Sequence, residues 1–198
     1  MRDYSPVFRS PITSVSASVA VVSRLGVADL TGVPVILIQG EVGDLLKQYF
    51  AQIPARPGDL VEVGGGVLAR LTPGELYLFG LSPNAPIPSI AAIEGSLVKE
   101  QRFAHVTDYT HGKTVIRLAG AAAPEFLSKI CGLDFHPTIF PNLRIAQTSA
   151  AKIKTLIARY DQSETPAYFL HVNRSLGQYF WEVVWEAGQE FGIRVAQA

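Results

Sequence analysis

The sequence predicts an α+β fold built from two similar lobes that are related by an internal repeat and together form one compact unit. Three observations lead to this prediction. A pattern of Asp-x-Thr, a glycine, a β-branched run and a second glycine occurs at 29–40 and again at 108–120. Short apolar runs rich in β-branched residues alternate with stretches of helical spacing. The 198 residues, 48% of them apolar, are enough to bury a substantial core.

The two copies of the repeat continue in the same order. Four apolar residues follow each second glycine at spacings i, i+1, i+4 and i+5, which puts them on one face of a helix. These residues are Leu45, Leu46, Tyr49 and Phe50 in the first copy, and Phe126, Leu127, Ile130 and Cys131 in the second. A turn, three strand-like segments and a closing helix, at 88–99 or at 176–190, complete each copy. Each copy therefore reads strand, strand, helix, three strands, helix, and we expect a pseudo-twofold relation between them.

The proline-rich segment 81–88 is the expected loop between the two units. Residues 1–85 then form an N-terminal lobe with its linking loop, and residues 86–198 form a C-terminal lobe. The helix at 88–99 could pack with either lobe. Because no flexible linker separates the copies, we expect the lobes to pack against each other.

The repeat also decides how the segment 143–160 is interpreted. Its apolar residues have near-helical spacing, but the corresponding segment 60–71 of the first copy contains the glycines 64–66, which favour a reversal between strands. We therefore predict two strands that are joined near 151–152. The triple glycine lacks the Lys-Ser/Thr of a P-loop, which leaves a turn as its interpretation.

The second closing helix has the clearer boundaries. Ser175 is expected to cap it, with Gln178 as the capping-box partner, and Gly192 follows near its end. Its apolar residues include Trp181 and Trp185 and cover more than one face, so several faces of the helix must be buried. Burial between the lobes is one alternative, and contact with a partner, for which tryptophan is a frequent anchor, is the other.

The charge balance excludes several classes of protein. The chain carries 17 basic and 17 acidic residues, a formal net charge of zero, and only 17% of its residues are charged. It is too apolar to be disordered and lacks the basic excess of a nucleic-acid binder. Sparse charge near neutrality favours association, which leaves an obligate partner and a compact monomer near its isoelectric point as alternatives.

The remaining composition gives little support for a metal site or a membrane anchor. The single cysteine, Cys131, excludes an intrachain disulfide, fits a reducing cytoplasmic compartment and is expected in the core. The four histidines show no metal-binding spacing. No stretch approaches the ~20 apolar residues of a membrane span. The apolar run 15–22 is interpreted as a strand rather than a signal peptide.

The densest polar cluster lies at 108–112. Asp108 and His111 could orient one another for acid–base chemistry. Alternatively, the cluster is a corner between strands in which Asp108 and Thr110 bond the backbone. The first copy keeps the aspartate and the threonine but has no histidine, which favours the corner.

Three further polar residues are candidates for a ligand cleft together with Asp108 and His111. Arg117 interrupts an apolar run and could face solvent, or pair with a carboxylate of a ligand or of another subunit. Asn173 and Arg174 directly precede the last helix, where they could point into a cleft between the lobes or form a capping turn. None of these residues is assigned a catalytic role.

Five short stretches resemble a known family when they are taken together in their order and spacing. They read ADLTG at 28–32, VTDYTHG at 106–112, ICGLDFHP at 130–137, AQTSAAKI at 146–153 and RSLGQYFWE at 174–182. With them the chain resembles the gamma subunits of heterotetrameric sarcosine oxidases, which are similar to the aminomethyltransferase, or T protein, of the glycine cleavage system. The resemblance implies an aminomethyltransferase-like, folate-binding type of fold.

The resemblance also implies a function. It points to a non-catalytic, structural or assembly subunit of a complex that oxidises sarcosine to glycine, with FAD, FMN and NAD on the larger flavoprotein subunits. The alternative is a stand-alone, folate-binding aminomethyltransferase-like protein. The Gly-Gly-x-x-x-Asp-type stretch of the T-protein folate region is replaced at 157–161, so tetrahydrofolate is not expected on this chain. An isolated subunit could also form a homo-oligomer through the face that its partner would cover.

Overall fold

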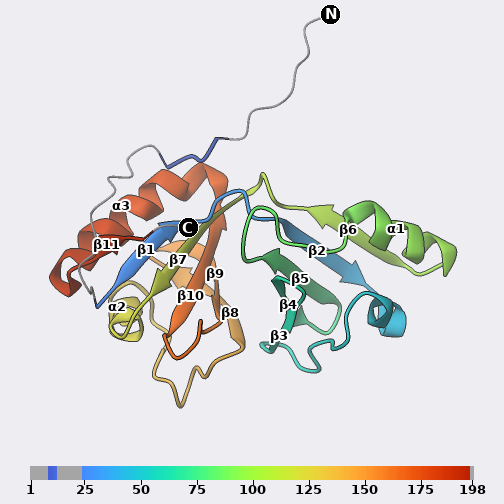
Figure 1. Cartoon of the computed structure of the whole chain (residues 1–198), viewed down its shortest axis with the longest axis horizontal. Helices are drawn as coiled ribbons and strands as arrows, with labels where there is room; N and C mark the ends of the chain where they lie inside the picture. The colour runs from blue at the N-terminus through green and yellow to red at the C-terminus, as the bar shows by residue number, and fades with distance from the viewer. Residues whose placement is uncertain (1–8, 13–23, 197–198) are drawn as a thin grey trace, which may run out of the picture.

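The computed structural model describes residues 9–12 and 24–196, and these residues form two lobes that lie side by side (Figure 1). The apolar run 15–22 lies outside the described residues. The first copy of the repeat comprises β1 (Gly26–Asp29), β2 (Val35–Gly40), the 3-10 helix η1 (Gly43–Gln48), β3 (Leu60–Val63), β4 (Gly66–Thr72), β5 (Glu75–Gly80) and α1 (Ile90–Lys99).

The second copy has the same order of elements. It comprises β6 (Ala104–Asp108), β7 (Lys113–Ala119), α2 (Ala123–Ile130), β8 (Arg144–Ala150), β9 (Ile153–Arg159), β10 (Ala167–Asn173), the 3-10 turn η2 (Arg174–Leu176) and α3 (Gly177–Gly188). The 3-10 turn η3 (Gln189–Phe191) and the short strand β11 (Arg194–Val195) follow. The predicted sequence of strand, strand, helix, three strands and helix is confirmed in both copies.

The two copies exchange their first strands. One sheet has the order β3-β4-β5-β2-β6, and the other has the order β11-β1-β7-β10-β9-β8. Strand β6 of the second copy therefore pairs with β2, and β1 of the first copy pairs with β7, both antiparallel. The exchange therefore connects the lobes at two places, which are related by a pseudo-twofold axis. The lobe boundary between residues 85 and 86 stays a prediction.

Three apolar layers hold the molecule together. In each sheet, successive side chains of a strand point to opposite faces, so that Leu76 and Leu78 of β5 face outward while Tyr77 and Phe79 face the other sheet. Helices α1 and η1 cover the outer face of the five-stranded sheet, and α2 and α3 cover that of the six-stranded sheet. The middle layer lies between the two sheets. Strands buried on both faces account for the high apolar content and the few charges.

The two reversals predicted from the repeat are confirmed. Gly64 and Gly65 form the turn between β3 and β4, and Ala151 and Lys152, both with positive φ, form the turn between β8 and β9. In each case two residues reverse the chain, as in tight hairpins. The helical spacing in 143–160 was therefore coincidental.

The last helix was expected to begin at residue 176 and begins one residue later. Ser175 lies inside η2, and α3 begins at Gly177 without a side-chain cap. The chain leaves β10 through a 3-10 turn, which moves Ser175 out of the capping position, and Gln178 donates to Glu182 at 2.7 Å instead. Gly192 ends the segment with φ +66°, as the sequence predicts.

Candidate functional site: a cleft between the lobes

Matching corners connect the lobes at the pseudo-twofold axis. The Asp29 carboxylate accepts from the Thr31 N–H at 2.9 Å, and the Asp108 carboxylate accepts from the Thr110 N–H at 2.8 Å. Each threonine hydroxyl then accepts a backbone N–H of the other copy, with Thr110 bonded to Val35 at 3.0 Å and Thr31 to the equivalent valine of β7 at 3.3 Å. The Asp-x-Thr motif of each copy therefore joins the two copies of the repeat. Thr31 bonds the end of β1 to β7 within the six-stranded sheet, and Thr110 bonds the end of β6 to β2 within the five-stranded sheet.

Replacing Thr110 by valine is expected to lower the free energy of unfolding by about 1–3 kcal/mol, because it leaves the buried N–H of Val35 without an acceptor. Thr110→Ser keeps the hydroxyl and serves as the control, with a smaller loss. Urea denaturation followed by circular dichroism measures both. Equal losses in the two variants would show that the hydroxyl is not what stabilises the corner.

Most of the residues that were predicted to line a ligand cleft lie apart from one another in the structure. The Asp108 carboxylate accepts from the backbone N–H of Thr110 in the corner, and His111 is exposed in the turn that follows. The guanidinium of Arg117 donates to Gln162 at 3.2 Å, with its pKa lowered by burial. Arg174 donates to the backbone oxygen of Arg9. Among the five predicted residues, Asn173 alone lines the cavity described below.

The tryptophans and their helix lie on the outer face of the six-stranded sheet. Trp181 is 3% exposed within that outer core, and Trp185 packs partly against it. Helix α3 is therefore not buried between the lobes, because the described residues of the middle layer come from strands and loops and none comes from α3. A contact of Trp181 and Trp185 with a partner protein stays a prediction.

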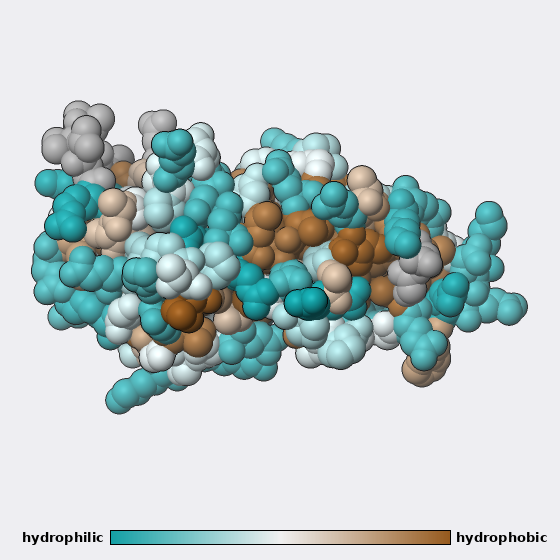
Figure 2. All heavy atoms as spheres, turned by 90° about the horizontal axis from the view of Figure 1, so that it is seen from below, coloured by the Kyte–Doolittle hydropathy of each residue, from teal (hydrophilic) through white to brown (hydrophobic). Residues whose placement is uncertain are grey.

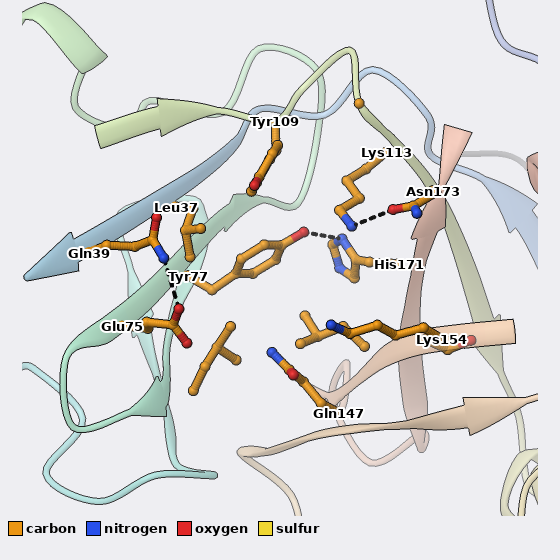
Figure 3. A pocket seen from close by; sticks show the side chains of 14 residues that line it. Leu37, Gln39, Glu75, Tyr77, Tyr109, Lys113, Gln147, Lys154, His171 and Asn173 are labelled. Carbon is orange, nitrogen blue, oxygen red and sulfur yellow. Dashed lines mark hydrogen bonds between the residues drawn. The ribbon is translucent and has the colours of Figure 1, made fainter. Parts of the chain in front are cut away.

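A cavity of about 410 Å³ lies between the sheets (Figure 3). The five-stranded sheet and the sheet-to-sheet corner contribute Leu37, Gln39, Leu71, Glu75, Tyr77, Tyr109 and Gly112, and the six-stranded sheet contributes Lys113, Gln147, Lys154, Thr155, Leu156, His171 and Asn173. In the view from below, apolar side chains gather in the middle of the molecule with polar groups around them (Figure 2). Volume and lining are those of a small-molecule site.

Tyr77 and His171 meet across the cavity from opposite sheets (Figure 3). The Tyr77 hydroxyl and His171 Nδ1 are 3.3 Å apart, and the imidazole packs edge-on against Phe79 with ring centroids 4.7 Å apart. His171 is 1% exposed, and burial, aided by the charge of Lys113, lowers its pKa to about 3. The imidazole is therefore neutral at pH 7, and its contact with Tyr77 is a polar interaction between the two lobes.

Acidification is expected to destabilise the protein through His171. Below pH 6.5 the unfolded chain protonates this histidine, whereas the folded chain does not until its pKa of about 3. Stability contributed by the neutral ring is thus present above pH 6.5 and lost as the pH falls toward 3. His171→Phe, which introduces the residue that the first copy has at the equivalent position 79, should reduce this loss. Thermal melts from pH 7 to pH 4 measure the difference, and parallel curves would contradict the prediction.

Two lysines line one wall of the cavity. Lys113 donates to Asn173 Oδ1 at 3.0 Å, and its ammonium lies 5.5 Å from the centre of the Tyr109 ring. Burial lowers the pKa of Lys113, and repulsion by Lys154 lowers it further. On the opposite wall, the Gln39 amide donates to Glu75 at 2.8 Å. The cavity therefore has a cationic end, and the opposite wall carries the Glu75 carboxylate near the aromatic ring of Tyr77.

Sequence reasoning missed most of this cavity. Lysines in a strand with alternating pattern are usually solvated, and nothing local shows that Lys113 and Lys154 face another sheet. The sequence did mark His171, because this histidine interrupts the apolar run 167–172, as Arg117 interrupts the apolar run 115–119. Within the described residues, no group of three or more His, Cys, Asp or Glu side chains could hold a metal ion.

The fold defines an α+β class of two repeated lobes with exchanged strands around a central cleft. The family described as the GCVT N-terminal domain matches residues 66–197, and the chain belongs to it. The predicted aminomethyltransferase-like fold is thereby confirmed. No helix in 24–196 is long and apolar enough to cross a membrane.

Individual relatives agree with the family. Sarcosine oxidase subunit gamma of Corynebacterium sp. (strain U-96) is 28% identical over 170 residues, which are 80% of each protein. A chain of the heterotetrameric sarcosine oxidase from Corynebacterium sp. U-96, solved in complex with pyrrole 2-carboxylate, superposes with a TM-score of 0.75 and 22% identity over 93% of this chain and 96% of that one. The predicted resemblance to the gamma subunits is confirmed.

A second solved structure shows how this chain relates to the T proteins. The glycine cleavage system aminomethyltransferase T from Bartonella henselae superposes with a TM-score of 0.64 and 14% identity. The match covers 89% of this chain and 48% of the aminomethyltransferase. The chain thus spans about half the length of that enzyme, and the likeness shows the fold alone.

Proposed function

We propose that the chain is the gamma subunit of a sarcosine oxidase-like complex, with a structural or assembly role and no catalytic residue of its own. The observation that carries this proposal is the match in length. The chain covers 96% of the matching chain of the sarcosine oxidase, against 48% of the aminomethyltransferase. The chain therefore matches about half of the transferase, whereas it matches nearly the full length of the oxidase chain.

The site residues support a structural role. Asp108 and Thr110 form a corner, and the buried imidazole of His171 bonds to Tyr77 and not to a cysteine or serine nucleophile. Under this proposal the flavins and nucleotide, FAD, FMN and NAD, reside on the larger subunits, and the complex works in the cytoplasm. Sparse charge and exposed apolar side chains such as Phe103, which is 92% exposed, fit a subunit that is covered by partners.

Co-expression with the flavoprotein subunits of the same source tests the proposal. A tag on this chain should retain yellow flavoprotein at a fixed stoichiometry, and the purified assembly should release hydrogen peroxide when sarcosine is added. Omitting this chain should leave the remaining subunits unassembled or unstable. A chain that elutes alone, while the flavoproteins assemble and turn over without it, would overturn the assembly role.

The cleft favours a second candidate function, folate binding. Glu75 and Gln39 offer an acceptor and a donor for a heteroaromatic ring edge, and Lys113 and Lys154 could hold the tail carboxylates of tetrahydrofolate. When bound, tetrahydrofolate supplies an acceptor for a one-carbon unit. Calorimetry on the full-length chain decides this candidate, and the absence of heat at millimolar tetrahydrofolate would exclude it.

A further inference from the structure

Lys113, Asn173 and Lys154 form a row across three neighbouring strands. Asn173 of β10 pairs with Lys113 of β7 in the sheet register. On the other side of β10, His171 pairs with Leu156 of β9, and Asn173 and Lys154 each lie two residues beyond that pair. Because side chains alternate along a strand, all three residues face the cavity, as Figure 3 shows.

The ammonium groups of half-buried Lys113 and exposed Lys154 both line the cavity, and they lack the ion pairs that two arginines of the described structure form. Arg144 is paired with Asp59 and Arg159 with Asp161. Between residues 24 and 196, neither Lys113 nor Lys154 forms an ion pair. Two like charges held close together in a cleft cost stability unless an anion joins them.

A second observation points to the same place. His171, on the strand between the two lysines, is 1% exposed, and its Nε2 has no hydrogen-bond partner among the described residues. Buried polar atoms without a partner are uncommon in folded proteins and call for an explanation. The imidazole of His171, with one nitrogen unbonded, and the two ammonium groups without ion pairs thus lie at the same end of the cavity.

We propose that Lys113, Lys154 and Asn173 form a binding site for a carboxylate, whose attached apolar body lies against Tyr77 and Leu156. The Asn173 Oδ1 already accepts from Lys113, so its amide N–H groups remain as donors to the anion. Charge-assisted hydrogen bonds from two ammonium groups match the two oxygens of a carboxylate. The described residues that line the cavity include no further lysine or arginine for a polyphosphate. The rest of the lining is aromatic, aliphatic and polar, and its one carboxylate, Glu75, accepts from Gln39.

The carboxylate could belong to a free small molecule or to an acidic side chain of a neighbouring subunit. The chemistry of recognition is the same in both cases. The inference goes beyond the assembly role and does not depend on it, because the site lies within this chain.

Thermal unfolding of the full-length chain with benzoate and with benzamide tests the site. The two probes have the same shape, and only benzoate carries the charge. Benzoate should raise the melting temperature in a saturable way, whereas benzamide should not. In Lys113→Gln and Lys154→Gln the apparent dissociation constant for benzoate should rise at least ~10-fold. Lys99→Gln, on an exposed lysine at the end of α1, is the matched control and should leave it unchanged.

The same variants separate a binding role from a structural one. Without benzoate, Lys154→Gln should melt at the same or a higher temperature than the parent, because repulsion with Lys113 is removed. Loss of benzoate binding together with unchanged folding would support the site. Absence of a benzoate-specific shift, an equal shift with inorganic phosphate, or a shift that both lysine variants retain would overturn it.

The assembled complex distinguishes the two sources of the carboxylate. Benzoate binding that persists in the complex supports a free small molecule. Benzoate binding that is lost on assembly, together with weaker assembly of Lys154→Gln, supports a side chain of the partner. Should the chain fail to assemble, the proposed subunit role fails, and the benzoate experiment on the isolated chain still tests the site.

Discussion

Phe79→Ala is expected to lower the free energy of unfolding by about 3–5 kcal/mol, because it opens a cavity in the layer that joins the lobes. The Phe79 ring is fully buried, and its centroid lies 5.7 Å from that of Phe169 and 4.7 Å from that of His171. Both partners come from the other sheet. Strands flank the site on both sides, so the surrounding residues have little freedom to fill the space.

Urea denaturation followed by tryptophan fluorescence and by circular dichroism measures this effect. The tryptophans lie in the C-terminal lobe, and the far-ultraviolet signal reports on both lobes. If the exchanged strands make the lobes one cooperative unit, both signals should shift together. Phe103→Ala is the matched control, because a side chain that is 92% exposed should change stability by less than about 0.5 kcal/mol. A loss below about 1 kcal/mol for Phe79→Ala would show that the middle layer is not a well-packed core.

The order of elements was predictable because it depends on residues that are close in the sequence. Helical spacing after Gly40 and Gly120, and the glycines at 64–66, are local signals that the two copies reinforce. The interpretation of 143–160 shows the value of the repeat, since its own spacing favours a helix. The structure has two strands there, as the first copy indicates.

The exchange of first strands could not be predicted from the sequence. An edge strand such as β1 offers the same backbone groups to either sheet, so its local sequence does not choose between them. The choice depends on contacts between distant residues, such as the bonds of Thr31 and Thr110 to the opposite copy. The location of α3 was missed for a similar reason, because an apolar helix face does not reveal which layer will cover it.

The cleft was predicted only in part. Its location between the lobes follows from the repeat, but most of its lining residues were unmarked in the sequence. Asn173 was found because it precedes a predicted helix, whereas Lys113 and Lys154 look like ordinary strand lysines. A comparison of the two copies would have helped, since His171 occupies the position of Phe79, and a buried histidine that replaces a core phenylalanine indicates a special environment.

Gly120→Ala is expected to lower the free energy of unfolding by about 2–5 kcal/mol, through backbone strain and a steric clash. Gly120 has φ +130°, which side-chain-bearing residues rarely adopt, and an added Cβ would lie 2.3 Å from the carbonyl oxygen of Arg24. That oxygen accepts the N–H of Ala122 and leads into the exchanged strand β1. The alanine would therefore push away the segment through which the first copy enters the second sheet.

The repeat provides a second test of the same contact. Gly40, the counterpart of Gly120, has φ +109°, and its added Cβ would lie 2.4 Å from the carbonyl oxygen of Phe103, directly before β6. Gly40→Ala should therefore destabilise the protein to a similar extent, and denaturation in urea measures both variants. Gly95→Ala is the control, since this helical glycine has no atom within 4 Å of an added Cβ and should gain roughly 0.5–1 kcal/mol. If Gly40→Ala and Gly120→Ala behaved like Gly95→Ala, the close approach of the exchanged strands to these glycines would not be a requirement of the fold.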